Sequence, residues 1–205
     1  PRLVVLSFLG LILTSTVLLM LPVSVKSGNV TFLDALFTAT SASCVTGLIV
    51  FDTFSKWTVF GQIVIICTIQ IGGLGFITIM TMLTRFIKKR VSLKEKLLLR
   101  ESMGTIYNGE MKSLVKVVLS GTILFEVLGA VILATQFIPQ MGVKNGLYTS
   151  VFLSVSAFCN AGFDVMGRIE PGSSLITVNH NPVIILTISM LIIIGGIGFI
   201  VWDDI

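Results

Sequence analysis

Four long apolar stretches alternate with shorter, more polar segments along this chain. They cover approximately residues 2–21, 57–84, 114–138 and 181–202. A helix needs about 20 residues to cross the roughly 30 Å hydrocarbon core of a bilayer, so each stretch is long enough to span one. The pattern predicts an all-α, multi-pass integral membrane protein surrounded by the lipid bilayer.

Two further apolar runs, residues 30–43 and 144–157, are too short to span a membrane. At about 1.5 Å per residue each would reach only ~21 Å. A re-entrant half-helix fits this length, and so does an interfacial helix or a buried extracellular loop. The sequence that follows each run favours the half-helix.

The segments that follow the two short runs repeat one another. Residues 41–48, SASCVTGL, align without gaps on residues 156–163, SAFCNAGF, with Ser, Ala, Cys and Gly in common. A second match, IGGLGFI at 71–77 and IGGIGFI at 194–200, lies at the corresponding end of the next long stretch. The sequence therefore predicts a unit of span, half-helix, glycine-containing loop and span that occurs twice.

This repeat divides the chain into three parts. The first repeat covers residues 1–84, the second covers residues 114–205, and a basic linker with an amphipathic helix, residues 85–113, joins them. Nine of the 14 Lys and Arg residues fall between residues 85 and 116, which predicts that the linker and both ends of the chain are cytoplasmic. Two repeats that begin on the same side are parallel, and a pore would lie on the axis that relates them.

A half-helix that descends from outside ends with its carbonyl groups near the membrane midplane. The helix dipole places about half a negative charge there, which favours cations. The chain then returns in extended form, and its unpaired backbone is tolerated where it lines a water-filled cavity. Its carbonyl groups could replace an ion's hydration shell, as in potassium filters. The predicted ion-binding backbone comprises Cys44, Val45, Thr46, Gly47, Cys159, Asn160, Ala161 and Gly162.

These loops resemble those of the Trk/Ktr/HKT potassium transporters, in particular the bacterial Ktr and Trk membrane subunits. The resemblance covers essentially the whole chain as the first two of four repeats, which together form a pseudo-fourfold pore. We therefore expect the natural polypeptide to continue and to contain the remaining two repeats. By motif, Gly47 and Gly162 match the first and second filter glycines of the family.

The resemblance also implies a function and partners. It implies potassium uptake across the plasma membrane, often coupled to sodium, by a homodimer. A cytosolic ring of RCK-type nucleotide-binding subunits would gate the pore. Potassium, with or without sodium, is then the transported ion and the only metal expected, held by the filter carbonyls, and the chain itself is expected to carry no cofactor.

Glu126 lies deep within the third long stretch. An ionised carboxylate costs at least a few kcal/mol there, so Glu126 is either bonded to helix ends, Ser or Thr, or takes part in ion passage or coupling. We expect Gln70 to form an interhelical hydrogen bond. The glycine clusters at 72–75 and 195–198 predict close helix packing or a hinge rather than dinucleotide binding, because they lie in apolar helices that follow no strand.

Composition narrows the remaining function classes. The net charge of +4 comes without a basic patch interleaved with aromatics, so we expect no nucleic-acid partner. Three Cys and one His make neither a disulfide framework nor a zinc site. An intramembrane enzyme remains as an alternative, but the sequence shows no His near a candidate Ser, and we expect no enzyme. A carrier for another inorganic cation or a solute is the other alternative, and an organic solute would predict charged or aromatic groups at the midplane, where few occur.

Overall fold

The computed structural model describes residues 2–86 and 111–197, and every regular element within these two ranges is a helix. The first range contains α1 (Arg2–Met20), η1 (Pro22–Ser24), α2 (Phe32–Ser43), α3 (Thr53–Lys56) and α4 (Val59–Phe86), where η marks a short 3₁₀ helix. The second contains α6 (Met111–Met141), α7 (Val143–Phe158), η2 (Met166–Arg168), η3 (Ser174–Val178) and α8 (Pro182–Ile197). The predicted all-α fold is therefore confirmed for the described residues.

The long helices α1, α4, α6 and α8 occupy the four apolar stretches. Within the described ranges, Val118–Met141 of α6 is long and apolar enough to cross a membrane, and Val5–Met20, Val59–Gly75 and Pro182–Ile197 are shorter apolar helices. Most of the predicted basic linker, residues 87–110, lies outside the described residues, as does the end of the last predicted span. The amphipathic helix expected in the linker stays a prediction.

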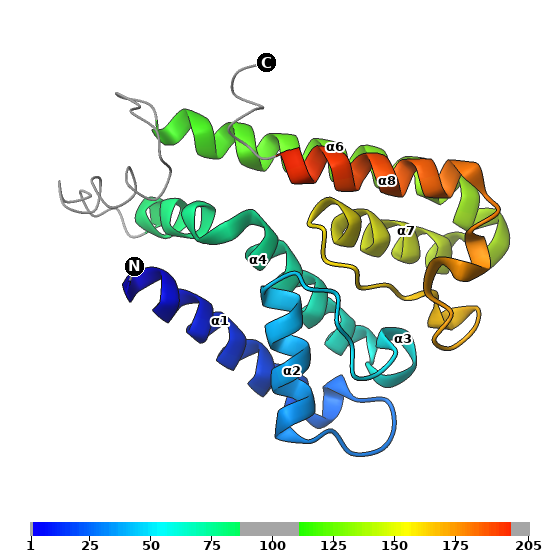
Figure 1. The fold of residues 1–205 in the computed structure, drawn as a ribbon, viewed down its shortest axis with the longest axis horizontal. Coiled ribbons are helices and arrows are strands. Elements are labelled where there is room, and N and C mark those ends of the chain that lie inside the picture. Colours follow the sequence, from blue (N-terminus) through cyan, green and yellow to red (C-terminus); the bar gives the residue numbers. More distant parts are fainter. Residues whose placement is uncertain (1, 87–110, 198–205) are drawn as a thin grey trace.

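The helices form two successive groups that run in the same direction. The first ends of α1 and α6 and the last end of α4 lie at one end of the molecule, and α8 runs back toward that end (Figure 1). In the first group α2 packs against α1 and α4, and in the second α7 packs against α6 and α8. Helices α4 and α7 also pack against each other, which joins the two groups.

The two short helices begin differently. Thr31 precedes α2 and forms a capping box: its hydroxyl accepts a hydrogen bond from the backbone N–H of Asp34, at 3.2 Å, and its own N–H donates to the Asp34 carboxylate at 2.9 Å. Helix α7 instead follows α6 after one residue, Gly142, whose φ of 79° is in the left-handed region that favours glycine. Helices α2 and α7, with 12 and 16 residues, are both shorter than the roughly 20 residues that a membrane span needs.

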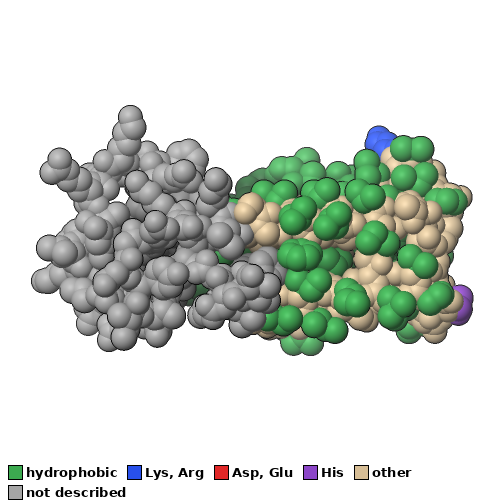
Figure 2. All heavy atoms as spheres, turned by 90° about the horizontal axis from the view of Figure 1, so that it is seen from above, with side chains coloured by type: hydrophobic (Ala, Val, Ile, Leu, Met, Phe, Trp, Pro, Cys, Tyr) green, Lys and Arg blue, Asp and Glu red, His purple; other side chains and the backbone are tan. Residues whose placement is uncertain are grey.

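The molecule exposes a large apolar surface. Leu6 on α1, Val131 on α6 and Leu186 on α8 are 64%, 59% and 63% exposed. Figure 2 views the molecule from above relative to Figure 1 and shows hydrophobic side chains spread over that face of the described part. The histidine lies at the end away from the grey residues. Apolar surface of this extent is typical of a protein in contact with lipid.

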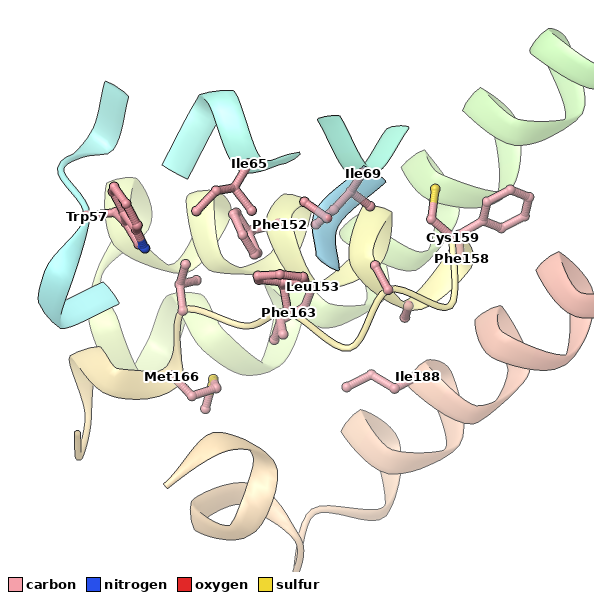
Figure 3. Packing of buried hydrophobic residues seen from close by; sticks show 14 of the residues in the cluster. Trp57, Ile65, Ile69, Phe152, Leu153, Phe158, Cys159, Phe163, Met166 and Ile188 are labelled. Carbon is pink, nitrogen blue, oxygen red and sulfur yellow. The ribbon is translucent and has the colours of Figure 1, made fainter. Parts of the chain in front are cut away.

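The buried core lies between the two groups of helices. Ile65 and Ile69 of α4 meet Phe152 and Leu153 of α7, and all four side chains are almost fully buried (Figure 3). The segment after α7 runs back along this helix and inserts Phe163 into the same core (Figure 3). The core therefore holds in place the second of the two loops that carry the predicted site.

Candidate ion-conducting site

The helices α2 and α7 end in the same hydrogen-bonded motif. In the first, the N–H of Thr46 donates to the carbonyl of Ser41 at 3.0 Å. In the second, the N–H of Ala161 donates to the carbonyl of Ser156 at 2.8 Å. The inner bonds also correspond, from Val45 to Ala42 at 3.4 Å and from Asn160 to Ala157 at 3.0 Å. This pair of bonds is the Schellman motif, which satisfies the last carbonyl groups of a helix and turns the chain back.

The turning residue of each motif has a positive φ, which is 49° at Val45 and 58° at Asn160. Asn adopts this left-handed conformation at low cost, whereas a β-branched Val is strained in it. The surrounding hydrogen bonds therefore impose the conformation at Val45. The two loops have the same backbone shape although their turning residues differ in chemistry.

Two residues further along, Gly47 and Gly162 bring the loops into contact. Their φ values are 74° and 71°, again in the left-handed region. A Cβ on Gly47 would lie 3.0 Å from the carbonyl oxygen of Ala161 and 3.3 Å from the Cα of Gly162. A Cβ on Gly162 would lie 3.2 Å from the Cα of Gly47. Glycine is thus required twice, by conformation and by the approach of the other loop.

A second pair of glycines holds the ends of α2 and α7. A Cβ on Gly72 would lie 2.0 Å from the carbonyl oxygen of Ser43, the last residue of α2. A Cβ on Gly195 would lie 1.9 Å from the carbonyl oxygen of Phe158, the last residue of α7. The prediction of close helix packing is confirmed at these two positions. Gly75, in contrast, has non-helical angles (φ 73°, ψ 165°) and interrupts α4.

A polar link between α4, α6 and the second loop lies beside this packing. The Cys159 thiol donates to Oε1 of Gln70 with a separation of 3.9 Å, and the Gln70 side chain hydrogen-bonds the Glu126 carboxyl group. A Cβ on Gly73 would lie 2.8 Å from Cys159 Sγ. The predicted interhelical hydrogen bond of Gln70 is confirmed. Glu126 lies on α6 among these groups, and its Oε1 is buried without a hydrogen-bond partner.

A second link joins α4 to α7 nearer the start of α4. The Tyr148 hydroxyl donates to Oε1 of Gln62 at 2.8 Å, and Nε2 of Gln62 donates to the carbonyl of Trp57 at the same distance. Gln62 and Trp57 are 1% exposed. This buried link fixes α7 relative to α4.

Two carboxylates form hydrogen bonds that stabilise the segments after α2 and α7. The sequence analysis did not predict this role for either of them. Asp52 caps α3 by accepting the N–H of Ser55 at 2.7 Å and also accepts the N–H of Gly172 at 3.4 Å. Asp164 accepts the N–H of Met166 at 2.8 Å and the Ser174 hydroxyl at 2.7 Å. Asp164 follows the second loop glycine by two residues, which is the signal that could have found it.

Two cationic side chains, those of Lys26 and Arg168, lie against the ring of Phe54. Lys26 Nζ lies 3.7 Å and the Arg168 guanidinium 4.7 Å from the centre of the Phe54 ring. Such contacts attract a cation to the ring face. Burial, followed by repulsion from Arg168, lowers the pKa of Lys26 below its ordinary value, while Asp52 opposes the shift. These contacts tie the loop after α1 to α3 and to η2.

Comparison with known proteins identifies the family of this chain. Residues 3–205 match the TrkH family, described as cation transport proteins. The chain belongs to this family. This match agrees with the resemblance inferred from the loops and places the chain in a family of cation transport proteins.

Three curated relatives in the family match over the whole chain. The potassium/sodium uptake protein NtpJ of Enterococcus hirae is 42% identical, and the chain covers 44% of its length. The Ktr system potassium uptake proteins B of Bacillus subtilis and Vibrio alginolyticus are 41% and 40% identical, with 45% and 44% of their lengths covered. The chain thus spans a little under half the length of these relatives.

The structure places the predicted site residues in two groups. All eight filter positions lie in the loops after α2 and α7, where Gly47 contacts Ala161 and Gly162. Cys44 is exposed and Cys159 is buried, so the two equivalent cysteines differ in surroundings. Glu126 lies on α6 outside the two loops and is linked to the second loop through Gln70 and Cys159.

Proposed function

We propose that this chain contributes half of a pore for potassium uptake across the plasma membrane. The backbone carbonyls of residues 44–47 and 159–162 would line the selectivity filter. The observation that carries the proposal is the meeting of Gly47 and Gly162, at the tips of two loops with the same backbone shape. Glycine at this approach keeps side chains out of the space between the two loop tips, so backbone carbonyl groups there could face an ion.

The helix ends support a preference for cations. Both α2 and α7 direct their carbonyl ends toward the start of these loops, where a helix dipole carries about half a negative charge. The predicted filter residues 44–47 and 159–162 include no charged side chain. A cation would therefore be held by dipoles alone, which bind weakly enough to permit release.

The rest of the pore is proposed to come from the same polypeptide. The relatives are much longer than this chain, and two further repeats would close a fourfold arrangement around the axis. We propose a homodimer that is gated by a cytosolic RCK-type nucleotide-binding ring, since two relatives are named as parts of a Ktr system. Coupling to sodium is suggested by the name of the Enterococcus relative.

Three alanine variants test the proposal in the full-length protein, in a bacterial strain that lacks its own potassium uptake. Gly47→Ala and Gly162→Ala should each lower rubidium uptake at least tenfold, and Gly47→Asp or Gly162→Asp should abolish it. Gly172→Ala is the matched control, because Gly172 has a similar φ of 75° but no atom within 4 Å of its Cβ position. Uptake that survives in both loop variants as well as in the control would overturn the proposed filter.

A further inference from the structure

One serine occupies the same place on each half-helix and contacts the loop that follows. Ser41 and Ser156 lie in the last turns of α2 and α7 and are 4% and 2% exposed. The carbonyl of each accepts the long Schellman bond from the loop, as described above. Each serine therefore already holds its loop through the backbone.

The hydroxyl groups of both serines make a second bond to the same loops. The Ser41 hydroxyl and Oγ1 of Thr46 are 2.8 Å apart and hydrogen-bonded. The Ser156 hydroxyl donates to the carbonyl of Phe163 at 2.5 Å. Each serine thus ties its loop at two points, one through the main chain and one through the side chain.

One sequence difference explains why the two hydroxyls have different partners. The position of Thr46 in the first loop corresponds to Ala161 in the second. Ala161 offers no hydroxyl, so the Ser156 side chain bonds the next available acceptor, a backbone carbonyl directly after Gly162. The use of the serine is the same in both loops although the bonded atom differs.

Other serines of α7 show that this role depends on position. The Ser150 hydroxyl donates to the carbonyl of Gly146 in its own preceding turn, and the Ser154 hydroxyl donates to the carbonyl of Glu126 on α6. Both residues have 0% exposure, and their printed bonds lie away from the loop. Burial of a serine on this helix is therefore not enough to bring it to the filter.

We propose that Ser41 and Ser156 are positioning residues for ion selectivity. They fix the direction of the loop backbone, and through it the spacing of the carbonyl groups that select potassium over sodium. The inference rests on the proposed function, because it assigns a role in the same filter. An extended loop has few hydrogen-bond partners within its own backbone, so a fixed hydroxyl limits the conformations that it can adopt.

The test compares Ser156→Ala with Ser150→Ala in the full-length protein, expressed in a strain that lacks potassium uptake. Rubidium and sodium uptake are measured separately and divided by the amount of protein in the membrane. Ser156→Ala should lower the ratio of rubidium to sodium uptake about tenfold, the equivalent of one buried hydrogen bond. Ser150→Ala should leave the ratio unchanged, and Ser156→Thr, which keeps a hydroxyl, should restore most of it.

The outcomes separate the inference from the proposed function. Wild-type protein without rubidium uptake would refute the function itself. Normal wild-type uptake with an unchanged ratio in Ser156→Ala would refute the positioning role alone. A Ser156→Ala protein that is present at a reduced level but keeps its ratio would also refute it, because a purely structural serine predicts that result.

Discussion

The Cα atom of Gly72 lies directly against the carbonyl oxygen of Ser43, so α4 touches the last residue of α2 without an intervening side chain. Gly195 has the same relation to Phe158 at the end of α7. The two carbonyl ends that are proposed to attract cations are thus each held by a glycine from the following long helix. Four predictions follow from these contacts, from those between the two groups of helices and from the capping box of α2.

The Gly72→Ala substitution should destabilise the protein strongly. A Cβ would lie 2.0 Å from a backbone oxygen, and a backbone atom moves less readily than the end of a side chain. Overpacking typically costs about 1–3 kcal/mol, and we expect the upper part of this range. The measurement is the melting temperature of the purified protein in detergent. Gly10→Ala is the control, because no atom lies within 4 Å of that Cβ position, and an equal fall in both variants would contradict the prediction.

The Tyr148→Phe substitution should weaken the contact between α4 and α7. It removes a buried hydrogen bond to Gln62 and keeps the aromatic ring, so the expected loss of stability is about 1 kcal/mol. A double-mutant cycle with Gln62→Leu checks that this bond is the cause. The effect of Tyr148→Phe should largely disappear in the Gln62→Leu background. Additive losses in the double variant would argue against the bond.

Acid should weaken the start of α2. The hydrogen bonds from the Thr31 side chain and backbone lower the pKa of Asp34 from its ordinary value of 3.8. A carboxylate whose pKa is lowered by folding stabilises the folded state above its unfolded pKa, and this contribution is lost as the pH falls through the lowered value. The protection factors of the first α2 amides against hydrogen exchange should therefore fall on acidification below about pH 4. Asp34→Asn should remove most of that pH dependence, and an unchanged profile would contradict the assignment.

The Glu126→Gln substitution should retain potassium uptake within about twofold of the wild-type rate. The carboxyl group hydrogen-bonds Gln70 on α4 and does not belong to the loops that carry Gly47 and Gly162, and a neutral amide keeps hydrogen-bonding capacity. Rubidium uptake with and without sodium is the measurement. A large loss of uptake, or a loss of its sodium dependence, would instead assign Glu126 to ion passage or coupling.

Local features of the fold could be read from the sequence. Short helices were predicted over residues 30–43 and 144–157, and α2 and α7 cover Phe32–Ser43 and Val143–Phe158, while their re-entrant placement in a membrane stays a prediction. Both follow from short-range rules, because apolar length and the glycine-containing loops are visible in a few consecutive residues. The close approach of Gly72 and Gly195 could be expected for the same reason.

Contacts between distant segments could not be read in this way. The Tyr148–Gln62 bond joins residues 86 positions apart, and the Asp52–Gly172 bond joins residues 120 apart. None of these residues lies in a sequence motif that predicts its partner. The packing of the two groups of helices brings both pairs together. The partner of the Ser156 hydroxyl was also hidden, because it depends on the path of the returning loop.

The single residue between α6 and α7 makes these two helices a mechanical unit. Gly142 donates its N–H to Ile138 in α6 at 2.9 Å, and its carbonyl accepts the N–H of Gly146 in α7 at 2.8 Å. In the first group, residues 21–31 separate α1 from α2, and backbone hydrogen bonds from Lys26 to Lys56 and from Thr58 to Ser24 tie this segment to α3 and to the start of α4. A movement of α6 would therefore pass directly to α7, whereas the connection from α1 to α2 runs through a segment that is also held by α3.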